Sequence, residues 1–133
     1  MTLSVFAAAR PVVAPGKEGV VYYPSMGLQV STDNGKTFTR LDSLAACMAV
    51  GLGKGKTDSD PYTIFVWGKP TNDDSIGLYW SEDEGKTWSK VRDDQHQFGG
   101  PGNGYFVVGD MNKYGRVYMS TVGLGIVYGD LVQ

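Results

Sequence analysis

The sequence has few residues that could carry chemistry. Among 133 residues there is one cysteine, Cys47, and one histidine, His96. A single cysteine excludes an intramolecular disulfide, and one histidine without a second cysteine makes a poor metal site. Because Cys47 lies in an apolar run over residues 44–53 that is typical of an inner strand, we expect a buried, unreactive thiol.

Long apolar runs and clustered positive charge are also missing. No run approaches the roughly 20 apolar residues of a membrane span. The formal net charge is −2 and the lysines and arginines are scattered, which gives no positive field for nucleic acid. The first ten residues lack the basic region of a signal peptide. We therefore expect no membrane or nucleic-acid partner, no metal and no cofactor.

What the chain does have is a repeated eight-residue phrase, at residues 31–38 and again at 81–88. Both copies read Ser-x-Asp-x-Gly-Lys-Thr followed by an aromatic residue, and both lie between strand-like runs. The glycine supplies the positive φ of a tight turn, and the aspartate accepts N–H groups inside that turn. The threonine and the aromatic are expected to begin the returning strand. The phrase therefore predicts two structural hairpin corners, formed by Ser31, Asp33, Gly35, Thr37, Phe38, Ser81, Asp83, Gly85, Thr87 and Trp88.

Strand signals come in groups, and no helical period persists over ten residues. Two groups of four strands align with each other, and a third group stops after three. A repeat of short strands at this spacing is typical of a β-propeller. We predict an all-β chain of about two and three-quarter four-stranded antiparallel blades, an incomplete propeller. The predicted parts are a blade over 10–43, a blade over 44–94, and a partial blade over 99–131 that strand 3–8 would complete.

The repeated phrase resembles the Asp-box, or bacterial neuraminidase repeat, of propeller rims. Residues 88–100, "WSKVRDDQHQFGG", and residues 109–130, "GDMNKYGRVYMSTVGLGIVYGD", resemble the C-terminal end of glycoside hydrolase family 74. That resemblance implies two seven-bladed propellers that hydrolyse xylose-branched β-1,4-glucans with inversion, outside the cell. It also implies that one aspartate from each propeller acts as acid or base, far upstream of the matched segment. No residue here would then be catalytic, and the isolated chain is expected to be inactive.

Two alternatives remain open from the sequence. The chain could be a carbohydrate-binding module that uses Trp67, Tyr105, Tyr114 and His96 against a xyloglucan-type polysaccharide. It could also be a structural fragment that assembles with copies of itself as a homo-oligomer. In either case the expected partners are a polysaccharide, the remainder of a propeller, or a second copy of the chain.

Overall fold

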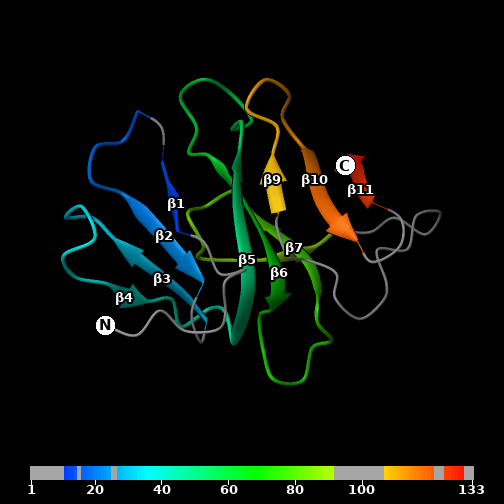
Figure 1. Cartoon of the computed structure of the whole chain (residues 1–133), viewed down its shortest axis with the longest axis horizontal. Helices are drawn as coiled ribbons and strands as arrows, with labels where there is room; N and C mark the ends of the chain where they lie inside the picture. Colours follow the sequence, from blue (N-terminus) through cyan, green and yellow to red (C-terminus); the bar gives the residue numbers. More distant parts are fainter. Residues whose placement is uncertain (1–10, 15, 25–26, 92–106, 122–124, 131–133) are drawn as a thin grey trace.

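Figure 1 shows the computed structural model of the chain, which describes residues 11–14, 16–24, 27–91, 107–121 and 125–130. These ranges consist of strands and turns. Helix is absent from them, and so is any helix able to cross a membrane. The all-β prediction is therefore confirmed.

The strands form three antiparallel sheets, each with its strands in chain order. The first sheet contains β1 (Val12–Val13), β2 (Val21–Pro24), β3 (Leu28–Ser31) and β4 (Thr39–Arg40). The second sheet contains β5 (Ala46–Gly53), β6 (Thr63–Lys69), β7 (Gly77–Ser81) and β8 (Ser89–Lys90). The third sheet contains β9 (Val107–Gly109), β10 (Arg116–Thr121) and β11 (Gly125–Asp130).

These sheets have the form expected of propeller blades. The first and second contain four antiparallel strands each, and the third contains three among the residues described. The strand over 3–8 that was predicted to complete the third blade lies outside the described residues. In Figure 1 the three sheets lie side by side in chain order, so each sheet faces the next.

The first strand of each sheet lies at the centre of this arrangement. β5 contacts β1 and β2 on one side and β9 on the other. The approach of β9 is close enough to require glycine: a Cβ added at Gly51 would lie 2.2 Å from the carbonyl oxygen of Val107. Since real Cβ atoms keep well outside that distance, a side chain at this position would force β5 and β9 apart.

Buried apolar side chains of the second sheet point to both of its faces. Ile64 and Val66 of β6 belong to a buried cluster against the first sheet, whereas Phe65 belongs to a cluster against the third. All three are at most 1% exposed. Since successive side chains of a strand point to opposite faces, a strand between two neighbouring blades has to be apolar along its whole length. This requirement explains the run "TIFVWGK" at 63–69.

The returning strands of the two corners start later than predicted. They begin at Thr39 and Ser89, whereas the sequence favoured a start at Thr37 and Thr87. The reason lies in the corner itself, because the N–H groups of Thr37 and Thr87 donate to aspartate carboxylates. A strand ladder cannot use a donor that the turn already holds.

Candidate functional site

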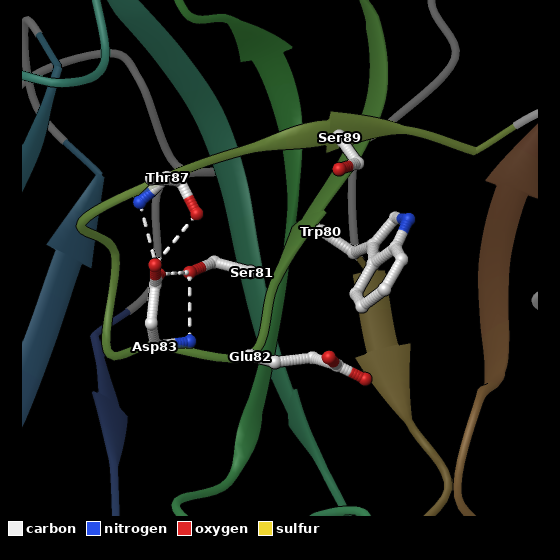
Figure 2. Close-up of a pocket in the computed structure, with 6 residues that line it drawn as sticks. All are labelled: Trp80, Ser81, Glu82, Asp83, Thr87 and Ser89. Atoms are coloured by element: carbon white, nitrogen blue, oxygen red, sulfur yellow. Dashed lines mark hydrogen bonds between the residues drawn. The ribbon is translucent and has the colours of Figure 1, made fainter.

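The second corner, residues 81–88, is closed by two polar side chains (Figure 2). The hydroxyl of Ser81 donates to Asp83 Oδ1 at 2.7 Å and accepts the N–H groups of Asp83 at 3.3 Å and Gly85 at 2.9 Å. Asp83 in turn accepts the N–H of Thr87 at 2.9 Å and its hydroxyl at 2.6 Å. Both carboxylate oxygens are thus engaged inside their own turn.

The first corner, residues 31–38, has the same hydrogen bonds. Ser31 Oγ donates to Asp33 Oδ1 at 2.7 Å and accepts the N–H of Gly35 at 2.8 Å. Asp33 accepts the N–H of Thr37 at 2.8 Å and its hydroxyl at 2.6 Å. Because every partner lies within a few residues, the phrase folds identically in two different blades.

Each corner contains two consecutive residues with positive φ, although the sequence predicted only one. Gly35 and Gly85 have φ of 84° and 88°, and the residues before them, Asn34 and Glu84, have φ of 65° and 63°. Asparagine tolerates this region, but glutamate is strained there. A Cβ added at Gly85 would lie 2.6 Å from Cδ1 of Leu41, so the leucine side chain would have to move.

The electrostatics of both corners favour ionised aspartates. The Thr37 hydroxyl, followed by its N–H and the Ser31 hydroxyl, lowers the pKa of Asp33 from 3.8 to about 2. For Asp83, desolvation raises the pKa, but hydrogen bonds from Thr87 and Ser81 outweigh it and bring the value to about 2. A carboxyl that has lost its proton by pH 4 cannot serve as a general acid near neutral pH.

The second corner also makes contacts outside its own sheet. Trp88 Nε1 donates to Ser43 Oγ at 2.9 Å, and that hydroxyl donates to the carbonyl oxygen of Gly85. The Nζ of Lys17 lies 3.9 Å from a carboxylate oxygen of Glu84. Ser43 and Lys17 both come from the first blade. Neither residue could be identified from the sequence, because the contacts depend on how two blades meet.

An open depression of about 340 Å³ lies along the second corner and the adjoining ends of β7 and β8. Its lining residues are Trp80, Ser81, Glu82, Asp83, Thr87 and Ser89. Figure 2 shows Trp80 and Glu82 projecting away from the hydrogen-bonded group of Ser81 and Asp83. One carboxylate oxygen of Glu82, Oε1, is buried and has no hydrogen-bond partner in the described part of the chain. The depression is therefore lined by an indole and a carboxylate side chain, and Trp80 also packs against the core cluster between the second and third sheets.

The four predicted sugar-binding residues are placed as follows. Tyr105 and His96 lie outside the described residues. Trp67 is partly buried on β6 and packs against the core cluster between the second and third sheets. Tyr114 is partly exposed in the turn between β9 and β10. A carbohydrate-binding role for these four residues stays a prediction.

Cys47 is 6% exposed on β5, and its thiol donates to the carbonyl oxygen of Ala49 at 3.3 Å. Burial raises the pKa of this thiol to about 12, so little thiolate exists near neutral pH. Within the ranges that the structure describes, histidine, cysteine and acidic side chains do not gather in groups of three or more that could hold a metal ion.

Similar proteins of known name are found for nearly the whole chain. Xyloglucanase Xgh74A of Acetivibrio thermocellus is 42% identical over 118 residues, which cover 87% of this chain and 14% of that protein. The oligoxyloglucan-reducing end-specific xyloglucanase of Emericella nidulans is 31% identical over 137 residues, which cover 98% of this chain and 16% of that protein. No family model matches the chain.

Solved structures agree with the sequence similarity. The GH74 enzyme of Niastella koreensis has a TM-score of 0.78 and 42% identity, covering 90% of this chain and 17% of that one. The GH74 xyloglucanase of Xanthomonas campestris has a TM-score of 0.76 and 32% identity, covering 92% of this chain and 16% of that one. The chain thus spans about one sixth of each structure that it resembles.

Proposed function

We propose that this chain, which matches a propeller segment of glycoside hydrolase family 74 in sequence and in fold, serves as blades of a xyloglucan-hydrolysing enzyme. The observation that carries the proposal is the 42% identity to xyloglucanase Xgh74A over 118 residues. The GH74 structures agree in fold, with TM-scores of 0.78 and 0.76. The family predicted from the sequence is thereby confirmed, and the substrate is carried over from these relatives.

The small share of Xgh74A that the chain covers bears on whether the chain could be catalytic alone. Because the chain spans only 14% of the length of Xgh74A, most of an enzyme of that kind lies outside it. Hydrolysis with inversion needs two carboxyl groups about 6.5–9.5 Å apart with a water between them. Asp33 and Asp83 are committed to their own turns and do not suit that task. We therefore expect the isolated chain to leave xyloglucan intact, and an extracellular setting follows from the polymeric substrate.

A chimaera tests the proposal directly. The matching segment of Xgh74A is replaced by this chain, and reducing ends released from xyloglucan are measured for the chimaera, for unmodified Xgh74A and for the isolated chain. We expect the chimaera and unmodified Xgh74A to release reducing ends, and the isolated chain to release none. A chimaera that folds but has lost activity would contradict the assigned role, and so would steady hydrolysis by the isolated chain.

A second candidate function is carbohydrate binding without hydrolysis, which the depression beside Trp80 favours. Indole faces stack on sugar rings, and the side chain of Glu82 lines the same depression. Affinity electrophoresis in xyloglucan gels tests this candidate. Binding by the isolated chain that Glu82→Gln weakens, and that Glu84→Gln leaves unchanged, would favour it. Migration that xyloglucan does not retard would eliminate it.

A further inference from the structure

The first corner contains an asparagine that is directly followed by glycine, the pair Asn34 and Gly35. In such a pair the backbone nitrogen of the glycine can attack Cγ of the asparagine side chain. The new C–N bond closes a cyclic imide, and the side-chain amide nitrogen leaves as ammonia with the proton of the glycine N–H. Water then opens the imide at either carbonyl, which yields aspartate or isoaspartate. Because glycine has no Cβ, it hinders this ring closure least.

The two corners differ in this chemistry although they share their hydrogen bonds. Glu84 holds the position of Asn34 in the repeat, with φ of 63° against 65°, and it too is followed by glycine. A glutamate carboxylate has no amide nitrogen to release, so the second corner cannot lose ammonia in this way. Asn34 is exposed, so water reaches its side chain. Access of water therefore does not limit the reaction at the first corner.

The backbone of the pair is held by two hydrogen bonds. The N–H of Gly35 donates to Ser31 Oγ at 2.8 Å, and the N–H of Asn34 donates to the carbonyl oxygen of Gly19 at 3.1 Å. Ring closure requires the Gly35 nitrogen to turn towards the Asn34 side chain and to give up its proton. The bond to Ser31 has to break first. Since Ser31 is only 1% exposed, its hydroxyl is a fixed part of the corner.

The turn between β1 and β2 restrains the pair from outside the corner. Gly19 lies in this turn with φ of 83°, and a Cβ added to it would lie 3.0 Å from the carbonyl oxygen of Thr32. The same Cβ would lie 3.6 Å from Oδ1 of Asn34. The backbone of the turn thus lies against the corner. Rotation of Asn34 into a reactive conformation has to displace this turn as well.

We propose that Asn34 is a site of spontaneous deamidation, which the folded first corner suppresses and which becomes reactive when the corner opens. The two products have different consequences. Aspartate keeps the backbone unchanged and tolerates a positive φ as asparagine does. Isoaspartate inserts a methylene into the backbone before Gly35, which moves its N–H away from Ser31. The corner therefore closes again after the first outcome and stays open after the second. This inference goes beyond the proposed function and does not depend on the substrate.

The test compares the folded chain with the chain in guanidinium chloride, both in mildly alkaline buffer. Peptide mapping by mass spectrometry follows the conversion of Asn34 with time. In guanidinium chloride the pair Asn103 and Gly104 is the internal reference, and both asparagines should convert at the same rate. We expect Asn34 to convert at least about tenfold more slowly in the folded chain, because one hydrogen bond must open before the attack. Equal rates at Asn34 in the two conditions would overturn the proposal.

Two matched variants separate the corner from overall stability. Ser31→Ala and Ser81→Ala each remove one buried serine hydroxyl from a corner, but only Ser31→Ala releases the N–H of Gly35. In the folded state we expect Ser31→Ala to speed the conversion of Asn34 about tenfold and Ser81→Ala to change it far less. Equal acceleration by both variants would refute the guarding role of the corner, since global unfolding would then be the route. If Ser31→Ala does not fold, the ratio of folded to unfolded rates in the parent chain still decides.

The products test the second half of the proposal. Deamidated chains are separated by ion exchange, because a neutral amide has become a carboxylate, and their urea midpoints are measured. Asn34→Asp represents the aspartate product and should unfold at the midpoint of the parent chain. The isoaspartate form should unfold at a lower urea concentration. An isoaspartate form as stable as Asn34→Asp would contradict the claim that this product keeps the corner open.

Discussion

Replacing Ser81 by alanine should destabilise the chain far more than the size of the change suggests. Ser81 is 2% exposed, and its hydroxyl makes three hydrogen bonds, two of them as acceptor for the N–H groups of Asp83 and Gly85. Alanine cannot accept these bonds, and the hydrogen bond from the N–H of Gly85 is buried. A buried donor without a partner costs about 1–3 kcal/mol.

We therefore expect Ser81→Ala to lower the free energy of unfolding by about 2 kcal/mol. For a chain of this size that corresponds to a fall in Tm of roughly 6–10 °C. Urea and thermal unfolding followed by circular dichroism measure both quantities. Ser89→Ala is the control, because Ser89 lines the same depression but is exposed, and it should change stability by less than about 0.5 kcal/mol. If Ser81→Ala unfolds with the same midpoint as Ser89→Ala, the corner is not held by its serine.

Three further predictions follow from the structure. Because the pKa of Asp83 is about 2 in the folded chain and 3.8 ordinarily, its stabilising effect is present above pH 4 and is lost as the pH falls towards 2. Asp83→Asn should flatten the dependence of the urea midpoint on pH in that window, and an unchanged slope would argue against the hydrogen-bonded carboxylate. Gly51→Ala should cost at least about 2 kcal/mol, since its Cβ would lie 2.2 Å from a backbone oxygen of Val107. Gly77→Ala, whose Cβ would lie 3.4 Å from the side chain of Lys90 and 3.7 Å from that of Tyr79, should cost less, and equal costs would refute the close approach of β5 and β9. Cys47 should react with a thiol reagent only as fast as the chain unfolds, and rapid labelling of the folded protein would show that the inner strand is open.

Much of the fold could be predicted because it is encoded in short stretches. The apolar run over residues 44–53, which predicted an inner strand, became β5 (Ala46–Gly53), since apolar patterning and flanking turn residues define its ends. The corners could be predicted for the same reason, as the hydrogen bonds of their serine and aspartate side chains join residues at most four positions apart. Strands β4 and β8 were predicted too long, because threonine N–H groups are held by the aspartates.

The contacts between blades could not be predicted in this way. The bond from Trp88 to Ser43 joins residues 45 positions apart, and it exists only because two twisted sheets meet at a particular angle. The sequence marks Trp88 as an aromatic that starts a strand, which says nothing about its partner. The second positive φ of each corner was also missed, since glutamate at position 84 carries no sign of a left-handed conformation.

If the repeated phrase joins one blade to the next, Trp88 and Ser43 should be energetically coupled, and a double-mutant cycle on these two residues tests this most directly. Trp88→Phe removes the indole N–H and keeps an aromatic ring, as the first corner has at Phe38, while Ser43→Ala removes the acceptor. Free energies of unfolding are measured for the parent chain, both single variants and the double variant. Since the two side chains share a hydrogen bond of 2.9 Å, we expect a coupling energy of about 0.5–1.5 kcal/mol. If the changes in the free energy of unfolding of the two single variants simply add in the double variant, the corner does not connect the two blades through this hydrogen bond.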